Sequence, residues 1–259
     1  MTDERSLLRD LRALGAVRAP ATIAPVVLER VGLVEAYAPV ETTIGRAWVA
    51  FKGDVVTAVR RQTSARAFEL DFEREFGRGV HPAAELPARL ATALRTALTG
   101  GRPTGLRFDL AGLSDFERAV LRKALEVPVG EVRSYAWVAR EIGRPAAVRA
   151  VGSALGRNPI PILIPCHRIV RSDGAISDYI FGRSAKRALL AQEGADPDAL
   201  ERLGREGVRY VGSDTTRIYC FPTCRAARQI TEPHRVPFRS ERHAVRAGYR
   251  PCRVCRPAA

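Results

Sequence analysis

The first regular pattern along the chain lies in residues 35–62, where β-branched and aromatic runs flank a turn at Lys52-Gly53-Asp54. Runs of this kind, bounded by turn residues, are typical of β-strands. We therefore expect a strand followed by a hairpin. In residues 64–77 and 87–101 apolar positions recur every three or four residues, which predicts two helices. The pattern indicates a small α/β unit over residues 35–112.

From residue 113 onward the apolar spacing is helical. Ser114 and Glu117 have the spacing of a capping box ahead of the first helix, and Ser134 is a candidate N-cap for the next one. Three more helices are expected in residues 134–143, 144–157 and 184–194. The second of these segments, residues 144–157, is rich in alanine, glycine and arginine. Its small residues favour either close helix packing or close approach to another surface.

The remaining segments complete the predicted organisation. Residues 4–33 look helical with a break near residues 19–25, and residues 195–207 look like a linker. The chain is therefore divided into a helical extension, an α/β domain, a mainly helical domain, a linker and a C-terminal module, over residues 1–34, 35–112, 113–196, 197–206 and 207–259.

The charge is strongly basic and unevenly placed. The net charge is +14, and residues 201–259 carry 13 basic against 5 acidic side chains. Of the 42 basic residues only Lys52, Lys123 and Lys186 are lysines. A basic excess of this size favours a polyanionic partner, and arginine forks suit phosphate and base edges. The C-terminal module is thus expected to contact nucleic acid.

The N-terminal residues are charged and have no apolar core, so they do not resemble a signal peptide, and no apolar stretch reaches membrane-spanning length. We expect a cytoplasmic, nucleoid-associated protein without a membrane partner. Thiols stay reduced in that compartment, so the five cysteines are expected to be catalytic or metal-bound.

Cys166 stands in the short run PILIPCHRIV. A free thiol is only a few per cent ionised at neutral pH, so a nucleophilic role needs a lowered pKa, for which His167 and Arg168 are the nearby candidates. Because neighbouring side chains rarely pair directly, a water between Cys166 and His167 is the easier arrangement. A base also needs an orienting carboxylate, and Glu193 is a candidate. From these residues alone an inert buried cysteine and a Cys-His hydrolase both stay open.

The segments around Cys166 resemble a known family. NPIPILIPCHRIV, GEVRSYAWVA, RPAAVRAVGSALGRNP and GAISDYIFGRSAKRALLAQEG are similar to the O6-alkylguanine-DNA alkyltransferases over about residues 108–195. The resemblance implies a ribonuclease H-like α/β domain followed by a winged-helix-like domain with a helix-turn-helix. It also implies single-turnover transfer of an alkyl group, mainly methyl, from O6-alkylguanine in double-stranded DNA to the protein, which is expected to be a monomer.

The resemblance also assigns roles residue by residue. Cys166 matches the alkyl acceptor, His167 the base that acts through a water, and Glu193 the carboxylate that orients it. Tyr135 matches the residue that donates a proton to the leaving guanine and helps to rotate the nucleotide. Asn158 matches the link between the recognition helix and the active-site segment. Arg149 matches the side chain that fills the gap in the base stack, and further DNA contacts are expected at Ala147 and Arg168.

The implied substrate pocket contains one departure from the family pattern. Its predicted walls are Pro161, Tyr179, Ile180 and Phe181, and several relatives have small residues where this chain has Ile180 and Phe181. We expect Phe181 to narrow the pocket and to favour methyl over groups as large as benzyl. Asp178 places a carboxylate where relatives have a small or neutral residue, and nothing in the sequence explains it.

The last cysteines form a metal-binding pattern. Cys220 and Cys224 are separated by three residues, Cys252 and Cys255 by two, and 27 residues lie between the pairs. Four thiolates on two short loops predict one tetrahedral Zn²⁺, and we expect no organic cofactor. About 55 residues with few large apolar groups build little core, so the metal is expected to fold the module.

Residues 205–257 resemble the zinc domain of Ada-type repair proteins. The resemblance implies that Cys220 accepts a methyl group from a DNA methylphosphotriester while all four cysteines hold zinc. Thr216, Arg228 and Arg250 match groups that approach the DNA backbone, although the Cys224–Cys252 spacing is one residue longer than in close relatives. Arg217 replaces a common glycine. A purely structural or DNA-docking zinc is the alternative.

The module order bears on regulation. In the resembled proteins the zinc domain usually comes first and an activator region follows, whereas here it comes last. We therefore expect repair rather than transcriptional control. A damage-binding or signalling role remains the alternative for the C-terminal module.

Overall fold

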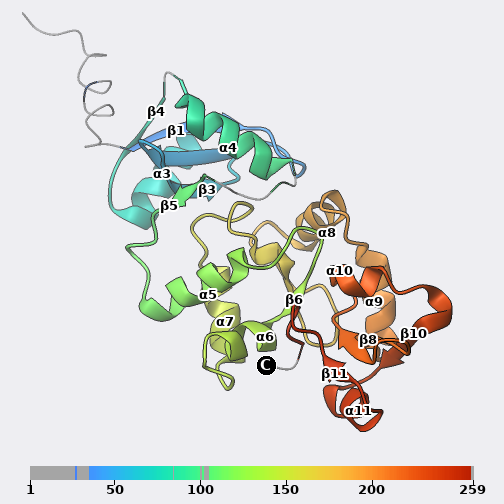
Figure 1. Cartoon of the computed structure of the whole chain (residues 1–259). Coiled ribbons are helices and arrows are strands. Elements are labelled where there is room, and N and C mark those ends of the chain that lie inside the picture. Colours follow the sequence, from blue (N-terminus) through green and yellow to red (C-terminus); the bar gives the residue numbers. More distant parts are fainter. Residues whose placement is uncertain (1–26, 28–34, 84, 100, 102–104, 258–259) are drawn as a thin grey trace, which may run out of the picture.

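The computed structural model describes Val27, residues 35–83, 85–99 and 101, and residues 105–257 (Figure 1). The helices expected within residues 4–33 fall outside these residues except for Val27. The described chain contains a five-stranded sheet, a helical part, and a C-terminal module built on a four-stranded sheet.

The first sheet has the order β4-β1-β2-β3-β5. Its strands are β1 (Glu35–Val40), β2 (Ala47–Lys52), β3 (Val55–Arg60), β4 (Val80–Pro82) and β5 (Arg107–Phe108). The predicted strand and hairpin are β1 and the antiparallel pair β2–β3, whose turn contains Gly53 at φ 57°. β4 and β5 pair in parallel with β1 and β3.

Both faces of this sheet are covered by a predicted helix. α3 (Ala65–Phe76) places Phe68 and Phe72 in a cluster with Trp48, while α4 (Ala88–Leu98) buries Leu90 and Leu94 in the cluster that contains Val49 and Val59. Because successive side chains of a strand point to opposite faces, one strand supplies both clusters.

The helical part follows the predicted caps. Its elements are α5 (Asp115–Leu125), β6 (Arg133–Ser134), α6 (Tyr135–Glu141), α7 (Val148–Gly156), the 3₁₀ turn η1 (Cys166–Arg168), β7 (Ile169–Val170) and α8 (Arg183–Gln192). The Ser114–Glu117 capping box is present at α5. Ser134 Oγ accepts the amide of Trp137 at 3.1 Å and caps α6.

The expected linker is wrong, because residues 197–205 form helix α9 (Pro197–Arg205). Asp196 accepts the amides of Asp198 and Ala199, and Pro197 occupies the first turn. Leu200 is buried with Leu190 of α8. The cap and the proline at the first helical position are start signals in the sequence itself, and the packing of Leu200 on α8 completes the helix.

The C-terminal module has the strand order β10-β8-β9-β11. Its elements are β8 (Tyr210–Ser213), β9 (Ile218–Cys220), α10 (Arg225–Arg228), η2 (Glu232–His234), β10 (Arg235–Phe238), α11 (Glu241–Arg246) and β11 (Arg250–Pro251). Tyr219, Phe238, Ala244 and Tyr249 form its small core. At Gly212 an added Cβ would lie 2.7 Å from the rings of Phe238 and Tyr249, so only glycine fits there.

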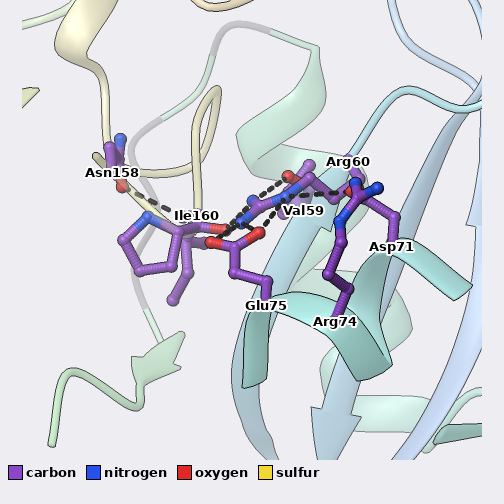
Figure 2. Close-up of polar contacts among 8 residues, drawn as sticks. Val59, Arg60, Asp71, Arg74, Glu75, Asn158 and Ile160 are labelled. Atoms are coloured by element: carbon purple, nitrogen blue, oxygen red, sulfur yellow. Dashed lines mark hydrogen bonds and ion pairs between the residues drawn. The ribbon is translucent and has the colours of Figure 1, made fainter. Parts of the chain in front are cut away.

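A buried arginine joins the first sheet to the segment after α7 (Figure 2). Arg60 Nη1 donates to the carbonyl of Pro159 at 2.7 Å, and the amide of Val59 donates to the same oxygen at 2.9 Å. Glu75 of α3 holds the guanidinium from the other side. The end of β3 therefore fixes the chain at the entrance to the segment that carries Cys166.

Candidate active site and zinc centre

The loop between α7 and Cys166 is organised by one amide side chain. Buried Asn158 donates through Nδ2 to the carbonyl of Ile164 at 3.0 Å and to Cys166 Sγ at 3.1 Å. Its Oδ1 accepts the amide of Ile160 at 3.0 Å. Ile162 has φ 73°, which is an uncommon conformation for a β-branched residue. Asn158 thus couples the end of α7 directly to the cysteine sulfur.

Cys166 is only 5% exposed and begins the 3₁₀ turn η1. Burial raises the pKa of its thiol, while the Asn158 hydrogen bond and the positive charge of Lys186 act in the opposite direction. Arg168, one of the two candidates named from the sequence for lowering this pKa, does not act on the thiol, because its guanidinium is bonded to Glu193 and to the carbonyl of Val127. Lys186, from α8, is the cation that acts on the thiol.

His167, Arg168 and Glu193 form a buried triad. His167 Nε2 lies 2.9 Å from Glu193 Oε1, and Arg168 bonds both oxygens of the same carboxylate at 2.8 Å. Arg168 also donates to the carbonyl of Val127 at 2.7 Å. Burial works to raise the pKa of Glu193, but the hydrogen bonds from His167 and Arg168 outweigh it and hold the pKa at about 2.

The triad defines the protonation of His167. Burial lowers the pKa of the imidazole, so the ring is neutral at neutral pH. Ionised Glu193 can only accept, so the proton of His167 lies on Nε2. Nδ1 is then a lone-pair acceptor, and it is buried with no hydrogen-bond partner among the described residues. The predicted pairing of His167 with Glu193 is present in the structure.

Tyr135 opens α6 and belongs to a second chain of polar contacts. Its hydroxyl lies 2.7 Å from Ser177 Oγ, which accepts from Lys186 Nζ at 3.0 Å. Lys186 also donates to the carbonyl of Ile169 at 2.6 Å, and burial lowers its pKa to about 8. Sequence reasoning missed Ser177 and Lys186. The sequence did contain one signal for Lys186: it is one of only three lysines in an arginine-rich chain, and the other basic residues of α8 are arginines.

Tyr135, Ser177 and Cys166 line a cavity of about 380 Å³. Its other lining residues are Gly152, Leu155, Gly156, Asp178, Tyr179 and Ile180. The ring of Phe181 packs edge-on against Tyr179 at 5.6 Å, and the guanidinium of Arg61 lies 5.8 Å from the Phe181 ring centroid. Pro161 is buried in the loop and does not line this cavity. Three of the four predicted pocket residues therefore lie at the cavity or against its wall.

The predicted DNA-contacting residues near this cavity have different positions. Arg149 is exposed on α7, together with the small residues Ala150 and Ser153, while Val151 and Leu155 face the core. Ala147 is the N-cap residue of α7 and is partly exposed.

Arg168 does not fit the predicted DNA contact, because it is 4% exposed and bonded to Glu193 and Val127. The sequence does not distinguish an arginine that is buried beside the active site from one that is exposed to DNA, because this difference depends on the fold.

The four C-terminal cysteines converge. Cys220 ends β9, Cys224 precedes α10, and Cys252 and Cys255 follow β11. All four are buried, and their Sγ atoms lie within 4.8 Å of one another. Tetrahedral Zn²⁺ with bonds of about 2.3 Å separates its sulfur ligands by about 3.8 Å. The observed spacing is within about 1 Å of this value, so the four cysteines fit one zinc ion.

The predicted DNA-contacting residues of the C-terminal module separate into two places. Thr216 and Arg250 are exposed where the β8–β9 turn meets β11, and the amide of Arg250 donates to the carbonyl of Arg217 at 2.9 Å. Arg217 has φ 54°, and its guanidinium lies over Tyr249 at 5.2 Å. Arg228 instead reaches toward Gly130 in the helical part.

Comparisons with known proteins agree with this geometry. Residues 115–195 match the family described as 6-O-methylguanine DNA methyltransferase, DNA binding domain, and residues 204–258 match the metal binding domain of Ada. The crystal structure of Mycobacterium tuberculosis OGT in complex with DNA is 32% identical, with a TM-score of 0.52, and the match covers 64% of this chain and 99% of that one. The chain belongs to the methylated-DNA–protein-cysteine methyltransferase family.

Curated relatives match the central part of the chain. The methyltransferase of Mycobacterium bovis is 47% identical over 88 residues, which are 34% of this chain and 53% of that protein. The human methyltransferase is 50% identical over 94 residues, which are 36% of this chain and 42% of that protein. The chain thus spans about half the length of the curated relatives it matches.

The match to the metal binding domain of Ada and the four converging sulfurs together establish a zinc site at Cys220, Cys224, Cys252 and Cys255. Within the described ranges, the helices are too short or too polar to cross a lipid bilayer.

Proposed function

We propose that this methyltransferase is a DNA repair protein that moves the alkyl group of O6-alkylguanine onto its own Cys166. The observation that carries the proposal is that Cys166 and Tyr135 line one cavity beside α7, while His167, the next residue after Cys166, is paired with buried Glu193. Lesion binding without transfer would not need a nucleophile there.

The transfer step balances within these residues. The Cys166 proton passes through a water to His167 Nδ1, the lone-pair atom of the ring, while Glu193 holds Nε2. The sulfur forms a bond to the alkyl carbon as the bond from that carbon to guanine O6 breaks. The electron pair stays with guanine, and Tyr135 donates a proton to the leaving base. A thioether is not hydrolysed under ordinary conditions, so each chain acts once.

The cavity lies at a helix that suits a duplex partner. Guanine O6 is inside the base stack, so the nucleotide must rotate out, at a cost of a few kcal/mol. Small residues on the exposed face of α7 permit close approach to a minor groove, and Arg149 fills the vacated space. We extend to this chain the DNA partner of the M. tuberculosis structure, with the chain acting as a monomer on nucleoid DNA in the cytoplasm.

The finer architecture is part of the same proposal. The sheet and helices of residues 35–112 form a ribonuclease H-like domain, and residues 113–196 form a winged-helix-like domain in which α6 and α7 are the helix-turn-helix. Residues 207–259 are the zinc domain.

The zinc centre has two candidate functions. In the first, Cys220 accepts a methyl group from a DNA methylphosphotriester, since Zn²⁺ with four thiolates carries net charge −2 and keeps sulfur ionised and electron-rich. Thr216 and Arg250 support this reading because they are exposed around the β9 strand that ends at Cys220. In the second, the centre is structural or docks DNA.

One experiment separates these functions. The intact protein is incubated with DNA treated with a methylating agent, and its mass and peptide map are compared with those of Cys166→Ala and Cys220→Ala. We expect one methyl group on the Cys166 peptide and a second on the Cys220 peptide. A methyl group on Cys166 alone makes the zinc centre structural or docking, and the absence of any adduct contradicts the acceptor proposal.

A further inference from the structure

The C-terminal module contacts the segment that leads into α6, the helix that starts at Tyr135, and also the C-terminal end of that helix. Before the helix, Thr223 Oγ1 accepts the amide of Val132 at 3.0 Å. The amide of Arg225 donates to buried Glu131 at 3.0 Å. Thr223 and Arg225 flank Cys224, so the first zinc loop holds the two residues that lead into β6 and α6.

The second zinc loop holds the other end of the same helix. Arg140 Nη2 donates to the carbonyl of Pro257 at 2.7 Å, and Arg256 Nη2 lies 2.6 Å from the carboxylate of Glu141. Arg256 directly follows Cys255. The first zinc loop therefore holds the segment that leads into α6, and the second holds the C-terminal end of that helix.

A buried ion pair and two aromatic rings lie between these contacts. Arg133 is 2% exposed, pairs with Glu131 at 2.6 Å, and lies over the rings of Trp137 and Phe221 at 5.6 and 5.2 Å. Trp137 belongs to α6, and Phe221 follows the zinc ligand Cys220. A buried charge pair flanked by two aromatic rings tolerates little movement, because each displacement leaves polar atoms unpaired.

These contacts reach the reacting groups through Tyr135. Its hydroxyl bonds Ser177, which also bonds Lys186, so a shift of α6 moves the tyrosine relative to Cys166. Zinc loops of this type are ordered only while the metal closes them. We propose that zinc binding at the four cysteines braces α6 and thereby positions Tyr135 for alkyl transfer to Cys166, with Thr223 as a positioning residue. This inference rests on the proposed function at Cys166.

The first test measures the position of α6 without any reaction. The chain has two tryptophans, so Trp48→Phe leaves Trp137 as the only one. When a chelator removes zinc from this full-length protein, we expect the Trp137 emission to shift to longer wavelength and the amides of α6 to exchange hydrogen faster. Unchanged emission and unchanged exchange in zinc-free protein would overturn the brace.

The second test measures alkyl transfer with a matched pair of variants. Thr223→Val removes the acceptor for the Val132 amide, while Thr223→Ser keeps it. With free O6-methylguanine as substrate, we expect Thr223→Val to lower the maximal rate of Cys166 methylation about fivefold at an unchanged half-saturating concentration, which corresponds to one lost hydrogen bond. We expect Thr223→Ser to restore the rate. Val245→Ala, at an exposed position of α11, serves as a neutral control.

The zinc content of each variant is measured alongside, and Arg256→Gln provides a second variant at the other end of α6. Full rates in both Thr223→Val and Arg256→Gln, with zinc bound, would refute the positioning role. Should the wild-type protein form no thioether at Cys166, the proposed function fails, while the Trp137 emission still decides whether zinc braces α6.

Discussion

At the scale of single residues, the active site depends on which charged groups are tied to one another. Arg168 forms an ion pair with Glu193 and so does not act on the thiol. Lys186 instead bonds Ser177, and its positive charge acts on Cys166. The same carboxylate fixes the proton of His167 on Nε2. One buried glutamate thus decides both the tautomer of the base and the cation that acts on the nucleophile.

Glu193 should make stability depend on acidic pH. Its pKa is about 2 in the folded chain and lies at the ordinary value of 4.5 in the unfolded chain, so the folded state favours the ionised form. The stabilisation, about 3 kcal/mol, is complete above pH 4.5 and is lost as the pH falls toward 2. Urea unfolding from pH 7 to pH 3 should show this loss in the wild type and a smaller one in Glu193→Gln. Equal losses in both would contradict the assignment.

Phe181 should limit the size of the transferred group. Its ring stands edge-on to Tyr179 at the cavity wall, with Arg61 on the ring. Phe181→Ala removes the ring that packs against the wall residue Tyr179 and lets Tyr179 move, so inactivation by O6-benzylguanine should accelerate relative to O6-methylguanine, by about tenfold for one well-packed contact of about 1.4 kcal/mol. Comparable rates for the two bases in the wild type would show that the pocket does not select methyl.

At the scale of elements, the segment that carries Cys166 is held from both directions. On one side, the Asn158 side chain donates a hydrogen bond to the Cys166 sulfur. On the other side, Val59 and Arg60 of β3 donate hydrogen bonds to the carbonyl of Pro159. β3 and Pro159 lie about a hundred residues apart in the chain, so this contact ties the first sheet to the segment that leads to Cys166 (Figure 2).

Arg60→Met should therefore cost more than an ordinary surface substitution. It leaves the Pro159 carbonyl with one donor fewer and half-exposed Glu75 without its cation, so we expect about 2 kcal/mol lower stability in chemical denaturation. Arg74→Met is the matched control, since Arg74 is exposed on the same helix as Glu75 and pairs with Asp71, and it should cost under about 0.5 kcal/mol. A loss of similar size in both variants would refute a special role for Arg60.

At the scale of the whole molecule, the zinc centre is part of the main core. All four cysteines belong to the same hydrophobic cluster as Val151, Leu155 and Cys166. The module is also linked to the helical part by the Thr223 and Arg225 contacts and by the Arg256–Glu141 pair. An independently folded domain on a flexible linker would share neither a hydrophobic core nor buried hydrogen bonds with the rest of the chain.

Zinc removal should consequently lower the main thermal transition. Because a metal that binds only the folded state adds its binding free energy to stability, we expect a fall of at least several degrees in the main calorimetric peak after chelation. A second chelation in the presence of excess Zn²⁺ is the control. A main peak at an unchanged temperature, with only a small early transition lost, would show that the module unfolds on its own.

The local elements and the reactive residues of this protein can be read from the amino-acid sequence. Caps at Ser114 and Ser134, the turn at Gly53 and the paired cysteine spacings are encoded within a few residues, so they are readable without a fold. Which side chains meet depends on the packed fold. The fold directs Arg168 inward to Glu193 and places Ser177 between Tyr135 and Lys186. It also set the zinc loops against α6, because burial and long-range contact are properties of the packed chain.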